Sequence, residues 1–268
     1  SDQVTVMRNG KKVGDLPTSE ATATKLANMM VGREVLLRVE KPKVEPGEVV
    51  LKVENLSVVV DGKEKLKNVS FEVREGEVLG VAGVEGNGQT ELIEALTGLQ
   101  RSTSGTVQYR GKDVTNRSAR NLRETETAHV PANRKAHGYI ASYSNADNLI
   151  LGFHHMEPFC NNLGFLNQKE INENAVSLVE KYDIRPPIID IPTSSLSGGN
   201  QQKLVVAREF YREPKLLIIA QPTRGVDIGA IEFIHNQILG LQAKKTAILL
   251  VSAELEEIRS LSDRTIIM

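Results

Sequence analysis

The sequence predicts an α/β fold with an antiparallel β subdomain and a helical subdomain, and three observations support this. Residues 49–53 and 69–73 alternate apolar and polar side chains, as half-buried antiparallel strands do. Residues 78–82 form an unbroken apolar strand that runs into a glycine-rich loop and a helical pattern. Within the segment of about residues 134–195, helical spacing relates Ile171, Ala175, Leu178 and Val179.

The composition indicates a globular chain without a strongly charged partner. Its 268 residues are 40% hydrophobic, which is enough for one large domain or two unequal lobes, and the net charge is −1. Cys160 is the single cysteine, so no intramolecular disulfide is expected, and a packing role is favoured. No run of about 18 apolar residues occurs, so no bilayer span is expected. The start at Ser1 lacks signal-peptide features and is interpreted as a cut end.

A short internal repeat predicts a tandem of two similar domains. Residues 1–7 read SDQVTVM and residues 262–268 read SDRTIIM. The first copy continues through Asn9-Gly10 as a strand, a tight turn and a second strand, whereas the second copy stops at its first strand. The match between two such short segments could also be chance. We interpret the chain as the tail of one domain followed by nearly all of a second.

The residues after this hairpin are consistent with such a tail. Residues 18–31 show a helical pattern with Thr18 or Ser19 as the expected N-cap, and Gly32 stands where a helix end favours a left-handed residue. We therefore predict a tail at 1–40, a polar, proline-containing linker at 41–48, and a main domain at 49–268 that is truncated at its C-terminal end. Asp61-Gly62 predicts a turn between strands of this main domain.

The loop after residue 82 has the order of a P-loop: strand, glycine-rich loop, helix. Glycines let the backbone amides turn inward at a helix N-terminus, where the helix dipole favours a phosphate. A helix is expected from Glu91 to Leu99. Gln89 stands where the motif has lysine, and a tight strand–helix turn is the alternative reading. The residues predicted to bind nucleotide are Gly83, Gly86, Asn87, Gly88, Gln89, Thr90 and Glu91, with weak Mg²⁺ binding at Thr90.

A second glycine-rich segment decides the family resemblance. Residues 196–200 read LSGGN and precede a predicted helix at 203–210, a strand at 215–219 and the segment TRGVD at 223–227. In this order, and at these distances from the P-loop, the segments resemble the signature motif, the Walker B strand and the D-loop of ABC ATPases. The resemblance covers residues 49–268 and implies a P-loop NTPase fold of ABC type. It also implies that Asp227 is the D-loop aspartate.

The signature motif also has a physical interpretation of its own. Ser197 and the amides of Gly198 and Gly199 lie at a helix start, which makes a phosphate-binding nest, although an N-cap with a glycine hinge is the alternative. In the family this nest closes on nucleotide held by a partner domain's P-loop. The residues expected to act in this way are Leu196, Ser197, Gly198, Gly199 and Asn200.

Finer motifs resemble the importers of simple sugars and nucleosides, of the ribose, galactoside and BMP-nucleoside type. These motifs are LSGGNQQK at 196–203, TRGVD at 223–227 and SAELEE at 252–257, and residues 84–92 look most like the second, C-terminal domain of the nucleoside branch. The resemblance implies ATP or ADP with Mg²⁺ as cofactors, and a peripheral place on the cytoplasmic face of a bacterial membrane. It implies as partners a first nucleotide-binding domain, two transmembrane permease subunits and, indirectly, an extracytoplasmic solute-binding protein, but no nucleic acid.

Several catalytic positions of the family are substituted in this chain. The lysine, the Mg²⁺-holding aspartate and the water-polarising glutamate correspond to Gln89, Ala220 and Gln221, while Ala132 and Ala253 stand at the Gln-loop and switch-histidine positions. Val58, Val59 and Val60 stand where an adenine-stacking aromatic is expected. Phosphoryl transfer needs charge neutralisation and an oriented water, so no intact catalytic set is predicted. An error of register at one or two positions, or deliberate substitution, are the alternatives.

The preferred hypothesis is an asymmetric pair of domains whose working site lies on the partner. The helical subdomain at about 134–195 would pass motion to the permease, with a docking groove at 139–165. Aromatics there either pack in the core or meet coupling helices: Tyr143, Phe153, Phe159 and Phe165. No histidine has metal-ligand spacing. The rival hypotheses are an active ATPase with variant motifs, a soluble ABC protein acting on nucleic acid or the ribosome, and a purely structural domain.

Overall fold

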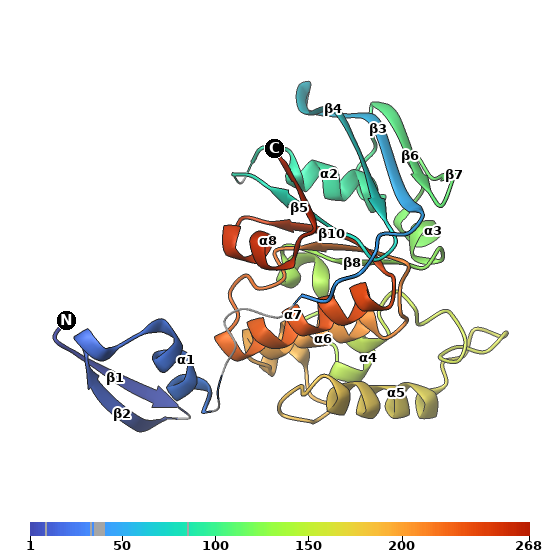
Figure 1. Cartoon of the computed structure of the whole chain (residues 1–268). Coiled ribbons are helices and arrows are strands. Elements are labelled where there is room, and N and C mark those ends of the chain that lie inside the picture. The colour runs from blue at the N-terminus through green and yellow to red at the C-terminus, as the bar shows by residue number, and fades with distance from the viewer. Residues whose placement is uncertain (9, 33, 35–40, 85) are drawn as a thin grey trace.

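A computed structural model of the chain describes residues 1–8, 10–32, 34, 41–84 and 86–268. At the N-terminus, β1 (Gln3–Arg8) and β2 (Lys11–Pro17) form the predicted antiparallel hairpin. A 3₁₀ turn, η1 (Thr18–Glu20), and helix α1 (Ala23–Val31) complete a small module, which contacts the main body through α1 and α7 (Ile228–Ala243) (Figure 1). Asn9 of the predicted turn lies outside the described residues.

The predicted cap of α1 is wrong. Thr22 is the N-cap, and its hydroxyl accepts a hydrogen bond from the Lys25 amide at 3.2 Å. Thr18 and Ser19 cannot cap the helix because they lie in the 3₁₀ turn that precedes it, where the Thr18 hydroxyl donates to the Ser1 carbonyl and its amide to the Asp2 carbonyl. Gly32 ends the helix at φ 86°, as predicted.

The predicted linker has no helix or strand at residues 41–47, but it lies against the main body. Lys41 Nζ is 2.8 Å from Asp263 Oδ1, and Lys245 Nζ donates to the Glu45 carbonyl at 2.6 Å. The Gly47 amide donates to the Glu75 carbonyl. The segment is therefore fixed along one end of the domain, whereas residues 35–40 of the predicted tail lie outside the described residues. The predicted domain boundaries stay a prediction.

An antiparallel sheet has the strand order β4-β3-β6-β7. Strands β3 (Val49–Val60) and β4 (Lys63–Arg74) contain the two predicted alternating segments and join through Asp61 and Gly62, both at positive φ. Two consecutive positive φ angles give the turn whose twist matches paired strands. The other two strands are β6 (Ser104–Tyr109) and β7 (Lys112–Asp113).

A five-stranded parallel sheet in the order β11-β5-β10-β9-β8 positions the candidate site. Its strands are β5 (Val78–Ala82), β8 (Thr127–Val130), β9 (Leu216–Ala220), β10 (Ala247–Ser252) and β11 (Arg264–Ile267). Since parallel strands end at the same edge, the loops after residues 82, 130, 220 and 252 begin side by side.

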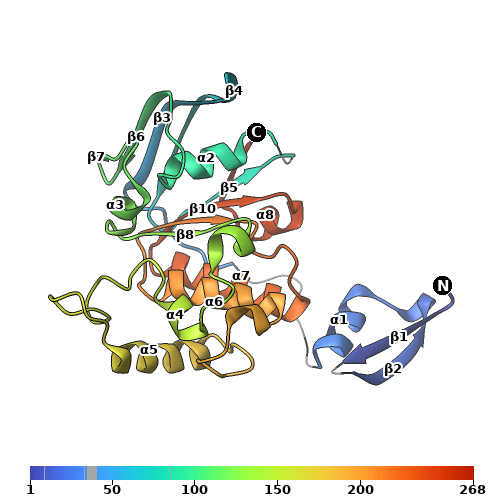
Figure 2. The ribbon, with the colours of Figure 1, turned by 180° about the vertical axis from the view of Figure 1, so that it is seen from behind.

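Alternate residues of these strands belong to two separate cores. Leu79, Leu249 and Ile218 pack with the antiparallel sheet and α2 (Gln89–Leu96), whereas Leu217 and Leu250 pack with α6 (Gly198–Phe210) and the helical subdomain. Figures 1 and 2 show the same arrangement, with α2 on one side of the parallel sheet and α6 and α7 on the other. The predicted α/β fold of ABC type is confirmed.

Two predicted helices have different bounds in the structure. The helix after the glycine-rich loop begins at Gln89 and ends at Leu96, because Gly98 turns the chain at φ 74°. The helix after the signature begins at Gly198, five residues before its predicted start at Lys203, because Ser197 caps it. The remaining helices are α3 (Ala119–Arg123), η2 (Arg134–Gly138, a π-helical turn), α4 (Asn145–Leu149), α5 (Gln168–Lys181), η3 (Thr193–Ser195) and α8 (Leu255–Leu261).

The helical subdomain contains the predicted apolar stripe on α5. Its four members, Ile171, Ala175, Leu178 and Val179, are all buried. Of the four aromatics that were expected either to pack in the core or to meet coupling helices, Phe153 and Phe159 are buried in the core, whereas Tyr143 and Phe165 are exposed. In the described part of the chain, no helix combines the length and apolar character needed for a membrane span.

The Glu209 carboxylate joins α6 to the sheet and to α3. It accepts hydrogen bonds from Arg208 Nε at 2.9 Å, from Arg123 at 3.0 Å and from the His129 backbone amide at 3.3 Å. The charges of Arg123 and Arg208 and their hydrogen bonds hold the pKa of Glu209 low even though burial raises it. Burial lowers the pKa of the neighbouring His129 to about 4, and the nearby arginines add to this effect.

The free energy of unfolding should therefore fall as the pH is lowered. The unfolded chain takes up a proton at a histidine pKa of about 6.5, whereas folded His129 resists protonation down to about 4, so about 2 kcal/mol is lost between pH 7 and pH 5. The free energy of unfolding, measured with urea at several pH values, should fall less steeply toward low pH in His129→Gln than in the unmodified chain. His154→Gln, which alters an exposed histidine, is the control, and identical slopes for all three proteins would contradict the assignment.

Candidate nucleotide-binding site

The carboxyl edge of the parallel sheet brings the substituted positions together. They line one small cavity of about 50 Å³, together with Gly83, Gly86 and Thr90 of the glycine-rich loop. The substituted positions in its wall are Gln89, Ala132, Ala220, Gln221 and Ala253. They come from the β5–α2 loop and from the chain after β8, β9 and β10, so the fold brings these positions into one cavity wall.

The glycine-rich loop has the backbone that a phosphate cradle requires. Gly86 and Gly88 have φ angles of 97° and 99°, which side chains disfavour. A Cβ on Gly88 would lie 2.7 Å from the Lys65 carbonyl, and one on Gly83 would lie 2.3 Å from Gln89 Nε2. The loop leads directly into the N-terminus of α2. Glu85 lies outside the described residues.

The Gln89 side chain is folded into this loop. Only 9% of the residue is exposed. Its Nε2 donates to the Val84 carbonyl at 3.1 Å, and its Oε1 accepts from the backbone N–H of Asn87 at 3.1 Å. A lysine ammonium at this position could donate but not accept. The neutral amide therefore uses one of the loop's own N–H groups and brings no positive charge.

The opposite wall of the cavity carries no acid among the described residues that follow β9 and β10. Ala220 ends β9 and is fully buried, and Gln221 has a φ of 48° with its Oε1 accepting from the Ala253 amide at 3.3 Å. Among the described residues that line the cavity there is no carboxylate. Mg²⁺ is usually held through one or two carboxylates, so the Thr90 hydroxyl with these neighbours does not fit a resident Mg²⁺ ion. An amide also cannot serve as a general base.

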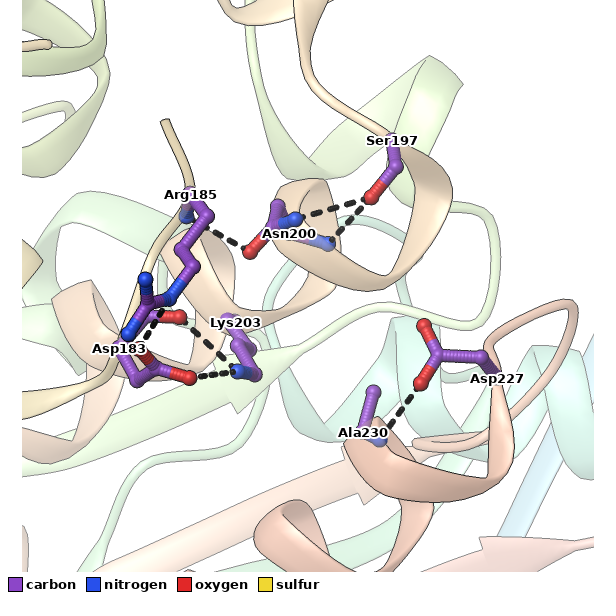
Figure 3. A network of polar contacts seen from close by, with 7 residues as sticks. All are labelled: Asp183, Arg185, Ser197, Asn200, Lys203, Asp227 and Ala230. Atoms are coloured by element: carbon purple, nitrogen blue, oxygen red, sulfur yellow. Dashed lines mark hydrogen bonds and ion pairs between the residues drawn. The ribbon is translucent and has the colours of Figure 1, made fainter. Parts of the chain in front are cut away.

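The signature segment builds a second helix start. Ser197 is the N-cap of α6, and its hydroxyl accepts from the Asn200 amide at 3.4 Å and from Asn200 Nδ2 at 2.9 Å (Figure 3). Among the described residues, the N–H groups of Gly198 and Gly199 have no hydrogen-bond acceptor. Leu196 is buried and anchors the segment. None of these five residues lines the cavity of the glycine-rich loop.

The D-loop packs against this helix start. Asp227 caps α7 by accepting from the Ala230 amide at 2.9 Å, and a Cβ on Gly199 would lie 2.6 Å from Asp227 Oδ2. Arg134 binds the other side of the D-loop by donating to the carbonyls of Arg224 at 2.6 Å and Gly225 at 3.0 Å. The signature and the D-loop thus form one unit.

Two features of this region had no signal in the sequence. Arg134 and its neighbours line a cleft of about 580 Å³ beside the glycine-rich loop. The lining contains one acidic residue among those described, Glu94, and five basic or histidine residues: His129, Arg134, Lys135, His137 and Arg224. In addition, His235 Nε2 lies 2.9 Å from Glu257 Oε1, and Thr223 donates to the same oxygen. These contacts join segments that are distant in the chain.

Comparison with known proteins gives a consistent family. The sequence model described as "ABC transporter" matches residues 66–224. The chain is 43% identical to a guanosine import ATP-binding protein of Bacillus subtilis and 42% identical to a nucleoside import ATP-binding protein of Lactococcus lactis, in both cases over 98% of this chain and 52% of the relative. A glucose import ATP-binding protein of Haloferax volcanii is 43% identical over 100% of the chain and 49% of that protein.

Solved structures share the fold. A nucleotide-free ATP-binding cassette from an ABC transporter superposes with a TM-score of 0.70 at 24% identity, covering 82% of this chain and 88% of that one. A dimeric bacterial cassette gives 0.69 at 19% identity, covering 81% and 94%. The chain itself spans about half the length of the curated relatives it matches.

The contact between Gly199 and Asp227 predicts a non-additive pair of substitutions. Asp227→Ala should lower the free energy of unfolding by about 1 kcal/mol by removing the cap of α7. Gly199→Ala should lower it by about 1–3 kcal/mol, because the new methyl group meets the carboxylate. In the double variant the clash with the carboxylate is gone and only the looser contact with the Ala230 Cβ at 3.3 Å is left, so the double variant should lose less stability than the sum of the two single losses. Urea unfolding measures this, and strict additivity would show that the contact is absent.

Proposed function

Because the chain belongs to the ABC transporter family, we propose that it is a nucleotide-binding domain that energises an importer while its own catalytic site is impaired. The observation that carries the proposal is the contrast between two helix starts. The cavity at α2 lacks a lysine and a carboxylate among its described residues, whereas the start of α6 keeps a serine and two amides without acceptors. The signature of this chain would then complete an active site on another domain.

We propose a nucleoside as the transported solute, with a simple sugar as the alternative. Two of the relatives are named for import of guanosine or nucleosides, and others of similar identity are named for glucose or ribose. The segment at 84–92 favours the nucleoside branch by its resemblance. The solute would be bound by a permease and an extracytoplasmic binding protein, which are separate chains.

The impaired site follows from the charges that phosphoryl transfer needs. Cleavage of ATP requires a cation on the β and γ phosphates, a held Mg²⁺ and a group that orients water. Gln89, Ala220 and Gln221 supply none of these, and Ala132 and Ala253 add no polar side chain. We therefore expect ATP or ADP to bind weakly to this domain, through loop amides that Gln89 leaves available, and without a strong Mg²⁺ requirement.

The working site would form in trans. In this arrangement a first nucleotide-binding domain holds ATP on its own P-loop, and Ser197, Gly198 and Gly199 close over the terminal phosphate. Asp227 and the D-loop would lie between the two sites, and ATP hydrolysis would reopen the pair. The helical subdomain would pass this motion to two permease subunits at the cytoplasmic face of the membrane. We propose that the chain holds the second position of a tandem subunit, by the resemblance of residues 84–92.

Three alternative functions make different predictions. An active ATPase with variant motifs would turn over ATP as an isolated chain. A soluble ABC protein of the nucleic-acid class would retain RNA or DNA during purification. A purely structural domain would tolerate loss of the Ser197 hydroxyl, because its value would lie in packing alone. Substitution of Ser197 tests the structural alternative, ATP turnover by the isolated chain tests the active-ATPase alternative, and absorbance of the purified chain at 260 nm tests for retained RNA or DNA.

Ser197→Ala tests the signature in the complete importer. Removal of a hydroxyl that contacts a phosphate should lower ATP hydrolysis and uptake by about tenfold or more. The matched control is Ser118→Ala, because Ser118 caps α3 in the same way and its hydroxyl accepts from the Asn121 amide at 3.3 Å. Unchanged transport by Ser197→Ala would favour the structural alternative.

Gln89→Lys tests the impaired site in the isolated chain. The unmodified chain should release no phosphate from ATP above background, with or without Mg²⁺. The lysine variant should bind ATP more tightly in a titration but still fail to hydrolyse it, since Ala220 and Gln221 provide no carboxylate. Steady Mg²⁺-dependent phosphate release by the unmodified chain would refute the proposal.

A further inference from the structure

Asn200 forms a hydrogen-bonded link between the signature serine and the turn after α5. Its Oδ1 accepts from the Arg185 backbone amide at 2.9 Å, and its Nδ2 donates to Ser197 Oγ at 2.9 Å (Figure 3). The turn is itself held on α6, because Lys203 Nζ donates to the Asp183 carbonyl at 2.9 Å and lies 3.2 Å from its Oδ2. Arg185 Nε also donates to Asp183 Oδ1 at 2.7 Å.

This geometry fixes the orientation of the Asn200 amide. A backbone N–H can only donate, so the atom facing the Arg185 amide must be the oxygen. The nitrogen of the same side chain then faces Ser197 Oγ. The reversed orientation is excluded, because it would place Asn200 Nδ2 against the Arg185 N–H, which pairs two donors.

The orientation of the amide fixes the role of the serine hydroxyl in turn. Ser197 Oγ accepts from Asn200 Nδ2 and from the Asn200 backbone amide, which occupies both of its lone pairs. Its hydrogen must therefore point away from Asn200. Ser197 is exposed, and no acceptor for this hydrogen lies among the described residues.

We propose that Asn200 is a positioning residue that makes the Ser197 hydroxyl an outward-pointing donor for the terminal phosphate of a nucleotide bound to the partner domain. The inference rests on the proposed function, since it names how the signature recognises that ligand. The hydroxyl adds a donor to the Gly198 and Gly199 amides at the start of the same helix. Because Asn200 also binds the Arg185 amide, movement of the turn after α5 would alter the direction of this donor.

A purely structural role for Asn200 makes the opposite prediction about two variants. Asn200→Asp keeps an acceptor for the Arg185 amide, and an acidic residue in the first turn of a helix is favourable for stability. It cannot donate to Ser197, however, so the hydroxyl should turn inward and donate to the carboxylate. Asn200→Ala loses the Arg185 link, but it leaves the hydroxyl free to rotate toward a phosphate.

The test compares these variants in the complete importer by ATP hydrolysis and by the apparent affinity for ATP and ADP. We expect Asn200→Asp to lose about tenfold or more in hydrolysis, as Ser197→Ala does, and Asn200→Ala to lose only about threefold. Affinity for ADP should be unchanged, because the missing phosphate is the one that the hydroxyl contacts. Stability should rank in the reverse order, with Asn200→Asp at least as stable as Asn200→Ala.

The double variant Ser197→Ala with Asn200→Asp separates the hydroxyl from simple charge repulsion. If Asn200 acts through Ser197, the double variant should be no slower than Ser197→Ala alone. A further tenfold loss in the double variant, or a larger loss for Asn200→Ala than for Asn200→Asp, would overturn the inference. Full activity of Ser197→Ala would instead refute the proposed function on which it rests.

Discussion

The candidate site depends on one constraint, the shared carboxyl edge of five parallel strands. Strands β5, β8, β9 and β10 each end at this edge, and the residues that follow each strand line the same small cavity. The two faces of the sheet are buried in separate cores, so the register of the strands cannot slip without exposing apolar side chains. The loops are therefore held together whether or not they carry catalytic groups.

Helices α2 and α6 both start next to glycines, and in each an amide side chain acts on the donors at the helix start. At α2, the oxygen of Gln89 accepts from the Asn87 amide and so uses a donor that a phosphate would need. At α6, the nitrogen of Asn200 donates to Ser197 and so leaves the serine hydrogen directed outward. Both helix starts have the same dipole. The two amide side chains thus differ in what they use: Gln89 takes up a backbone N–H group of its own loop, whereas Asn200 accepts from the distant Arg185 backbone N–H and leaves the donors at the start of α6 available.

Local pattern predicted the strands and the glycine turns, because these follow from periodicity and backbone freedom, whereas the roles of the substituted positions came from the family resemblance and stay a prediction. It failed where a side chain's partner lies elsewhere in the fold. Thr18 or Ser19 was expected to cap α1, but both lie in the 3₁₀ turn that Thr18 ties to the hairpin, and Thr22 is the cap. The Arg134 contacts with the D-loop and the Asn200 contact with Arg185 join distant segments, so no spacing in the sequence indicated them.

The fold itself requires a glycine in the glycine-rich loop, apart from any catalytic role. Gly88 lies so close to the Lys65 carbonyl that a Cβ would meet it at 2.7 Å, and Gln89 is buried with both ends of its amide bonded to the loop. These contacts place the start of α2 against β4 of the antiparallel sheet and tie Gln89 to Val84 and Asn87. Glycines at these positions are required by the backbone alone. Their presence therefore identifies the fold, while the neighbouring side chains determine whether the loop can perform chemistry.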